Sequence, residues 1–379
     1  MKLPRPHSDI PHLADVAPSV LAAMGVADFR APIALPGPVM GACVLLVDGL
    51  GAELLDNHAA DAPVLAEMRS GTLSVGFPST TAAGLAAVGT GCASGEHGMV
   101  GYSFRLPGTG VINAVRWRPH PWGADLRESV LPEAAQPRPT IFERAVGAGA
   151  AVSVISGTQF AGSGLTRAVL RGGRYIGVHA LGDLAARISD EVSGGGFCYG
   201  YHSELDMLGH LYGPGSLPWR MQLRQVDRMV ESLVESLPAG GLLAVVADHG
   251  MVAIEPGAAV DLDSSPTLLA GVEDLGGEPR ARYVYTRAGA QSDVLQTWQE
   301  ILGGRAWVVS REEAIESGWF GPRVLDAVRS RIGDVVAAAR DSNALVRLAT
   351  EPAESALLGH HGSLTEAEQL VPLLLAFSE

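Results

Sequence analysis

The chain has 379 residues, 47% of them apolar and 18% charged, which is the balance of a folded globular protein able to bury a sizeable core. Its 41 acidic residues exceed its 27 basic residues and give a formal net charge of −14 without a basic block or stripe, so a nucleic-acid polymer is not an expected partner. No apolar run approaches the roughly 20 residues that cross a bilayer, and the polar, proline-containing N-terminus has no signal core, so we expect a cytoplasmic protein without a membrane segment.

The first clear element is an unbroken apolar run at residues 42–47, which predicts a strand buried on both faces. It ends in Asp48-Gly49-Leu50-Gly51, and a helix is expected directly after it. Ligands of parallel α/β sheets bind at the carboxyl ends of the strands, so Asp48 is a candidate site residue. An isolated Asp-Gly pair is also typical of a simple turn.

A second strand is predicted at residues 72–77, and it leads into a hydroxyl pair, Thr80 and Thr81, at the start of a helix of small residues. The free N–H groups of a helix N-terminus and a hydroxyl side chain at the same place are typical of an anion site that contains a nucleophile. The simpler interpretation is that both threonines only cap the helix.

Residues 103–138 are rich in proline, arginine and tryptophan and show no clean period, so we expect an irregular excursion over the active face. The strand predicted at residues 196–201 then leads towards Asp206 and His210. These two residues lie four positions apart and share one face of a helical turn, where they can bind one ion together.

A third buried strand is predicted at residues 242–247, and it ends in Asp248 and His249. Adjacent Asp and His side chains can converge in the turn beyond a strand, which makes them a second metal-ligand pair. The chain thus offers a ligand set for two metal ions: Asp48, Asp206, His210, Asp248, His249 and His361.

The alternation of strands and helices predicts an α/β fold, with a mostly parallel central sheet and helices on both faces. Residues 252–345 break this pattern, and we interpret them as a small cap subdomain inserted into one catalytic domain that spans residues 1–379. After the insertion come Gly359-His360-His361-Gly362, a short capped helix and a last apolar run at residues 371–377.

Three motifs together resemble a known family. Asp206-x2-Gly209-His210-x2-Gly213-Pro214, Asp248-His249-Gly250-Met251 and Gly359-x-His361-Gly362-Ser363-Leu364 are similar to the signatures of the nucleotide pyrophosphatase/phosphodiesterase branch of the alkaline phosphatase superfamily. The resemblance covers residues 42–251 and the chain from about residue 355 onward. It implies two zinc ions, one held by Asp48, Thr81, Asp248 and His249 and the other by Asp206, His210 and His361.

The resemblance also indicates which of the two threonine hydroxyls is the nucleophile. In the family the nucleophile lies nine residues before a Thr-Gly pair, and counting back from Thr90-Gly91 gives Thr81 rather than Thr80. Thr80 is then expected to be an ordinary capping residue. The implied reaction is attack of Thr81 on phosphorus, followed by hydrolysis of the phosphothreonine by water.

The sequence departs from the family in two places. The branch usually follows its nucleophile with Phe-Pro-Asn, but this chain has Ala82-Ala83-Gly84. These smaller residues suggest an active-site floor that is roomier or differently shaped. The branch also places an Asn on a phosphate oxygen some twenty residues further on, where this chain has Tyr102, whose hydroxyl could donate one hydrogen bond instead. Tyr102 is therefore a predicted substrate contact.

The resulting hypothesis is a two-metal phosphodiesterase or nucleotide pyrophosphatase that acts on a small phosphate ester or nucleotide. The alternatives are a phosphomonoesterase or phosphotransferase of the same superfamily, and a non-catalytic module that binds metal or phosphate in the same pocket. Mixed Asp and His ligands suit Zn²⁺ and tolerate Mn²⁺. The sequence leaves the oligomeric state unknown.

Overall fold

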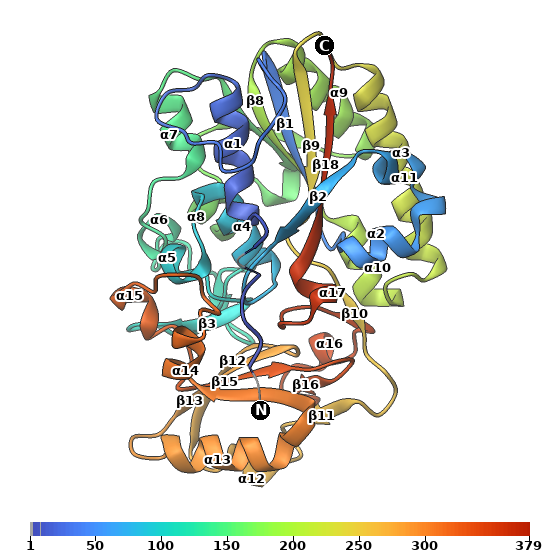
Figure 1. The fold of residues 1–379 in the computed structure, drawn as a ribbon. Coiled ribbons are helices and arrows are strands. Elements are labelled where there is room, and N and C mark those ends of the chain that lie inside the picture. Colours follow the sequence, from blue (N-terminus) through green and yellow to red (C-terminus); the bar gives the residue numbers. More distant parts are fainter. Residues whose placement is uncertain (1–2, 8) are drawn as a thin grey trace.

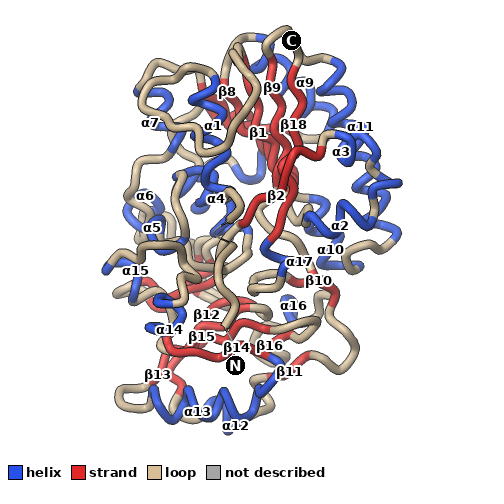
Figure 2. Tube along the Cα trace, viewed as in Figure 1, coloured by secondary structure: helices blue, strands red, loops and turns tan. Residues whose placement is uncertain are grey.

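The computed structural model describes residues 3–7 and 9–379 of the chain. A seven-stranded sheet forms its centre, in the order β2-β18-β9-β1-β8-β6-β7, and helices flank it on both sides (Figures 1 and 2). Its strands are β1 (Gly41–Val47), β2 (Arg69–Ser74), β6 (Val152–Gly157), β7 (Arg174–Val178), β8 (Phe197–His202), β9 (Gly241–Val246) and β18 (Leu370–Phe377). Each neighbouring pair from β9 to β7 is parallel, whereas β18 is antiparallel to both of its neighbours. The predicted α/β fold with a mostly parallel sheet is confirmed.

Helices lie on either side of this sheet in Figure 1. On the left are α1 (Val16–Ala23), α4 (Thr81–Thr90), α5 (Ser94–His97), α6 (Pro132–Ala135), α7 (Ile141–Gly147) and α8 (Gly164–Val169), and on the right are α2 (Ala52–Asn57), α3 (Pro63–Glu67), α9 (Leu181–Ser193), α10 (Glu204–Tyr212) and α11 (Leu217–Glu235). Because both faces are covered, every residue of β1 and β9 is buried, as their unbroken apolar runs predict. None of the helices in the described ranges is long and apolar enough to cross a membrane.

The last strand, β18, runs against the others because of where it starts. The preceding segment, with β17 (Gly359–His360) and α17 (Glu366–Gln369), lies at the carboxyl edge of the parallel strands. A strand that begins at this edge can only cross the sheet in the opposite direction.

Residues 103–138 are more regular than their sequence suggests. They contain β3 (Ser103–Leu106), β4 (Gly110–Asn113) and β5 (Arg118–Pro119), which pair as a three-stranded antiparallel sheet. The expectation of an irregular excursion is wrong for residues 103–119, because strands this short do not show a period, whereas residues 120–131 form no helix or strand. The turn between β3 and β4 uses two glycines with positive φ, Gly108 and Gly110.

Residues 252–345 build a second sheet with a hydrophobic core of its own. Its strands follow the antiparallel order β12 (Val272–Glu278), β13 (Ala281–Thr286), β15 (Val335–Ala339) and β14 (Ala306–Ser310). The core beneath them includes Trp298 from α13 (Gln291–Leu302) and Leu268 from α12 (Pro266–Leu269). The remaining elements of this region and its flanks are β10 (Val252–Ala253), β11 (Ala259–Asp261), α14 (Arg311–Glu316), α15 (Asp326–Arg329), β16 (Ala344–Val346) and α16 (Pro352–Ser355). The boundaries of the inserted cap stay a prediction.

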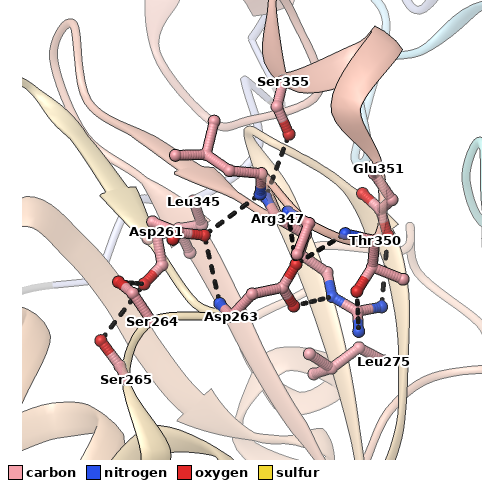
Figure 3. A network of polar contacts seen from close by, with 12 residues as sticks. Asp261, Asp263, Ser264, Ser265, Leu275, Leu345, Arg347, Thr350, Glu351 and Ser355 are labelled. Carbon is pink, nitrogen blue, oxygen red and sulfur yellow. Dashed lines mark hydrogen bonds and ion pairs between the residues drawn. The ribbon is translucent and has the colours of Figure 1, made fainter.

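Figure 3 shows a polar network that connects residues 261–265 with residues 345–355, at the end of this region. The carboxylate of Asp263 accepts hydrogen bonds from the backbone N–H groups of Ala349 and Thr350, at 3.1 and 2.8 Å, and from the Arg347 guanidinium at 3.1 Å. Arg347 also lies 3.5 Å from Glu351. The loop between β16 and α16 is therefore held against the segment that follows β11.

Glu351 extends this network into the interior. Its carboxylate lies 2.8 Å from the Arg282 guanidinium and 3.0 Å from the His120 imidazole, and all three side chains are at most 1% exposed. Burial alone would raise the pKa of Glu351, but the charge of Arg282 and the hydrogen bond from His120 outweigh it and hold the pKa well below its usual range. Arg282 lies on β13 and His120 follows β5, so Glu351 joins the four-stranded sheet to the three-stranded sheet.

Replacing Glu351 with alanine should destabilise the protein strongly, because Arg282 would keep a buried charge without its partner. Removing one member of a buried ion pair costs about 3–5 kcal/mol. Urea unfolding followed by circular dichroism measures the free energy of unfolding. The control is Asp56→Ala, since Asp56 is 62% exposed and its pair with Arg69 is worth about 0–1 kcal/mol. Equal midpoints for the two variants would contradict this account of Glu351.

Candidate metal centre

The predicted site residues come from several elements and meet at the carboxyl edge of the central sheet. β1 lies between β8 and β9, with Leu46 opposite both Tyr201 and Val246, so the segments that follow these strands emerge side by side. Asp48 follows β1, Asp206 and His210 lie on α10 after β8, Asp248 and His249 follow β9, Thr81 opens α4, and His361 follows β17.

A first group of candidate ligands surrounds the Nε2 atom of His249. This atom lies 3.3 Å from Asp48 Oδ1, 3.6 Å from Asp248 Oδ2 and 3.2 Å from the Thr81 hydroxyl. One donor atom from each of Asp48, Asp248 and His249 falls within 4.8 Å of the others. The structure therefore brings together all four residues that the resemblance assigns to the first ion.

A second group lies beside the first. His210 Nε2 is 3.3 Å from Asp206 Oδ2 and 3.2 Å from His361 Nε2. The rings of His249 and His361 stack with their centroids 3.5 Å apart, and donor atoms of Asp206, His249 and His361 also cluster within 4.8 Å. His249 thus lies at the boundary between the two groups.

The aspartates carry the clearest sign that these groups suit cations. Asp48 Oδ1, Asp206 Oδ1 and Asp248 Oδ2 are buried and accept no hydrogen bond. A buried carboxylate oxygen without a partner is costly, and protein interiors rarely leave one. Divalent cations would satisfy all three oxygens, so the donor set fits the two ions that the sequence predicts.

The three imidazoles are oriented in the same way. The Nδ1 atoms lie 2.7 Å from the Gly359 carbonyl for His210, 3.0 Å from the Gly250 carbonyl for His249, and 2.9 Å from the Ser79 carbonyl for His361. A carbonyl can only accept, so each Nδ1 carries a proton, and Nε2 is the nitrogen that remains to bind an ion. This is the usual arrangement of a metal-binding histidine, and it turns all three Nε2 atoms towards the centre.

Hydrogen bonds also select which oxygen of two aspartates is free. The Tyr201 hydroxyl donates to Asp48 Oδ2 at 2.5 Å, and the Gly49 N–H donates to Asp248 Oδ1 at 3.3 Å. In both residues the other oxygen is the unpartnered one. Sequence reasoning missed this role of Tyr201, because its contact with Asp48 depends on the pairing of β1 with β8.

Gly84 explains one departure from the family pattern. A Cβ atom at this position would lie 2.4 Å from Asp248 Cβ and 2.9 Å from its backbone. Any side chain here would push α4 away from the end of β9. Gly84 therefore allows the helix that carries Thr81 to approach the Asp248 ligand, instead of simply leaving more room.

The ionisation of the centre reflects its burial. Burial, followed by the charges of Asp248 and Asp206, raises the pKa of Asp48. Burial, followed by the charge of His249, lowers the pKa of His361. Burial alone would also lower the pKa of His210, but the Asp206 carboxylate raises it to about 9. The protein groups by themselves thus favour a protonated His210, so metal binding there would have to release a proton.

Ser79 joins the loop before Thr81 to the loop that carries His361. Its N–H donates to the Gly362 carbonyl at 3.3 Å and its hydroxyl to the Ser363 carbonyl at 2.8 Å, while the Gly362 N–H donates back to its hydroxyl at 3.2 Å. With the bond from His361 to its carbonyl, Ser79 makes four contacts across 282 or more residues of sequence. This fully buried serine fixes the position of the Thr81 loop relative to the His361 imidazole.

Thr80 does not play the role predicted from the sequence. It occupies the N-cap position of α4, but its side chain makes no capping hydrogen bond. Its hydroxyl donates instead to Glu278 Oε2 at 3.1 Å, because β12 brings this carboxyl group against the loop. Burial raises the pKa of Glu278 to about 8. Sequence reasoning missed Glu278, which lies in the inserted segment, far along the chain from every motif.

A cavity of about 300 Å³ lies over the candidate ligands. Thr81, Asp206, His210 and His361 line it on the side of the central sheet, and Tyr102 lines it as well. The Tyr102 hydroxyl donates a 3.0 Å hydrogen bond to Glu354. Tyr102 is therefore placed at the cavity, and its contact with a substrate phosphate stays a prediction.

The fold and this centre define an α/β protein with two adjacent candidate cation sites and the Thr81 hydroxyl between them and a cavity. The sequence matches the family model of type I phosphodiesterase/nucleotide pyrophosphatase over residues 42–364. The chain therefore belongs to this family, which lies in the alkaline phosphatase superfamily, and it is a phosphoester hydrolase. Among curated protein sequences, none matches significantly.

Solved structures share the fold at low sequence identity. Murine ectonucleotide pyrophosphatase/phosphodiesterase 5 superposes with a TM-score of 0.67 and 17% identity, over 89% of this chain and 88% of that one. An inactive variant of it in complex with AMP gives 0.65, 17% identity and the same coverage. Phosphonoacetate hydrolase from Sinorhizobium meliloti, in complex with phosphonoformate, gives 0.63 and 20% identity over 90% of each chain.

Replacing Ser79 with alanine keeps the carbonyl that accepts from His361 but removes the hydroxyl contacts with Gly362 and Ser363. This loss should weaken zinc binding about 10-fold, because residues that orient metal ligands typically contribute 10- to 100-fold to metal affinity. Titration against a chromogenic chelator measures the affinity. Ser94→Ala is the control, since its buried hydroxyl donates to the Phe77 carbonyl at 2.6 Å without touching the His361 loop. Unchanged zinc affinity in Ser79→Ala would show that this contact does not position His361.

Proposed function

We propose that this enzyme cleaves phosphodiester or nucleotide pyrophosphate bonds through a covalent phosphothreonine on Thr81. The carrying observation is the position of the Thr81 hydroxyl, 3.2 Å from His249 Nε2 and at the first position of α4. Family membership supports the reaction class. The complexes of two similar folds, with AMP in one and phosphonoformate in the other, support a small phosphorus-containing anion as the ligand.

The two candidate ligand groups would hold two divalent cations. Asp48, Thr81, Asp248 and His249 would bind one, and Asp206, His210 and His361 the other. When bound, such ions polarise phosphoryl oxygens and lower the pKa of a coordinated hydroxyl or water. The mixture of carboxylate and imidazole donors favours Zn²⁺ and tolerates Mn²⁺.

Thr81 is suited to be the nucleophile by its surroundings. The first N–H groups of a helix have no acceptor within it, so the start of α4 offers donors to the charge that develops on the phosphoryl oxygens. Thr80 points elsewhere, because its hydroxyl is engaged by Glu278.

The reaction divides into two displacements. The Thr81 oxygen forms a bond to phosphorus as its proton is lost, and the bond to the leaving alcohol or phosphate oxygen breaks. A water molecule then attacks the phosphothreonine, gives up a proton and releases the Thr81 oxygen. The N–H groups of α4 stabilise the charged phosphoryl group in both steps.

A strong chelator should abolish activity and added zinc should restore it. Without cations, the three unpartnered aspartate oxygens would repel the negative charge of the phosphoryl group rather than stabilise it. Hydrolysis of bis-p-nitrophenyl phosphate, followed at 405 nm, measures the effect. The same assay with p-nitrophenyl phosphate and thymidine p-nitrophenyl phosphate separates diesterase from monoesterase activity. Activity indifferent to the chelator would refute the two-cation centre, and absence of turnover with zinc, manganese and cobalt would favour a binding module.

Thr81→Ala should fold and bind metal but lose several orders of magnitude in turnover, because the covalent route is removed. The loss of a helix-entry hydroxyl changes stability by only about 1 kcal/mol. Thr81→Ser should keep measurable activity, and mass spectrometry of acid-quenched enzyme should find one phosphoryl group on the peptide that spans residues 77–91. Thr80→Ala, the matched control, should cost far less. A label on Thr80, or normal turnover by Thr81→Ala, would show that the nucleophile is misplaced.

A further inference from the structure

The cavity over the candidate ligands is lined by more acidic side chains than arginine or lysine side chains. Glu278 and Glu354 add two carboxyl groups to its wall beyond the proposed ligands. Arg116 is the single arginine or lysine among its lining residues. Its side chain is exposed, and within the described ranges it forms no ion pair. The one arginine among the lining residues is therefore available to a ligand.

The backbone that carries Arg116 is held firmly. The buried Asn113 side chain accepts hydrogen bonds from the N–H groups of Val115 at 3.1 Å and Arg116 at 2.8 Å. The next residue, Trp117, is fully buried, and its indole N–H donates to the Val130 carbonyl at 2.8 Å. A guanidinium on a fixed backbone loses only side-chain freedom when it binds, which favours affinity.

Arg116 and Tyr102 both line the cavity, on a shared wall where the Ala114 N–H donates to the Tyr102 carbonyl at 2.8 Å. Burial, followed by the charge of Glu354, raises the pKa of Tyr102, while the charge of Arg116 opposes this rise, so the guanidinium is within electrostatic range of the hydroxyl. Val115 and Leu357 add apolar surface to the cavity. A substrate with its phosphoryl group at Thr81 can thus extend an organic group along this wall towards Arg116.

We propose that Arg116 is a specificity-determining residue that binds a second anionic group, a carboxylate or a phosphate, on the organic part of the substrate. This inference rests on the proposed function, since it assumes a phosphoryl group at Thr81. The planar guanidinium can hold either anion through two parallel hydrogen bonds. The enzyme would then prefer phosphate esters with two separate anionic groups over those with one.

Three 4-nitrophenyl phosphodiesters that differ only in the second alcohol test this preference. The second alcohol is phenol, 4-carboxyphenol or 4-phosphonophenol, so the leaving group stays the same. Hydrogen bonds between charged groups predict kcat/KM about 10- to 100-fold higher for at least one charged diester than for the phenyl diester. The carboxylate and phosphonate arms show which anion is preferred. Equal kcat/KM for all three diesters would overturn the proposal.

Variants connect the preference to Arg116. Arg116→Gln should reduce the ratio of charged to phenyl diester kcat/KM by about 10-fold or more, and Arg116→Lys should retain part of the preference, because lysine keeps the charge without the planar fork. Arg118→Gln is the control, since Arg118 lies two residues further on, on β5, and does not line the cavity. An equal loss for all three diesters in Arg116→Gln would assign the residue a structural role and overturn the proposal.

A binding measurement separates this inference from the proposed function. Calorimetry with the zinc-loaded Thr81→Ala variant should show tighter binding of 4-carboxyphenylphosphonate than of phenylphosphonate, and adding Arg116→Gln should remove the difference. Equal affinities would overturn the role of Arg116 whether or not the enzyme turns over diesters. If 4-carboxyphenylphosphonate binds more tightly than phenylphosphonate but the wild-type enzyme hydrolyses none of the diesters, the proposed reaction is contradicted and the role of Arg116 in binding is not.

Discussion

The structure depends on placing three aspartates in its interior with one oxygen of each unpaired: Asp48, Asp206 and Asp248. Such a concentration of buried negative charge is unfavourable unless cations compensate it. The adjacent carboxyl ends of β1, β8 and β9 bring the three residues together, and backbone carbonyls orient the imidazoles around them. The same constraint explains why the Nε2 atoms and the unpaired oxygens gather in two adjacent groups.

The rest of the chain positions the reactive hydroxyl against this centre. Gly84 lets α4 approach the end of β9, and Ser79 fixes the loop before Thr81 to the loop of His361. These contacts join segments that are distant in sequence, so the geometry of the centre depends on the loop of residues 361–363, which precedes β18. Thr81 and the proposed second cation site therefore depend on the same loop, which carries His361.

The second sheet completes the cavity rather than standing apart from it. Glu278 reaches from β12 to the Thr80 hydroxyl, and Glu351 connects β13 with the end of the hairpin that carries Arg116. The candidate ligands at the central sheet and the cavity residues of the smaller sheets are thus held together by direct contacts.

The sequence by itself determined the central sheet and the candidate ligands, because both follow from local patterns. An unbroken apolar run specifies a buried strand, and the residue after it, as with Asp48 and Asp248, must lie at the sheet edge; the four-residue spacing of Asp206 and His210 specifies one helical face. Only the tertiary structure decided the partner of Thr80, the direction of β18, and the places of Ser79, Glu278 and Arg116. Each of these depends on contacts between segments far apart in the chain, and no local period or spacing encodes such contacts.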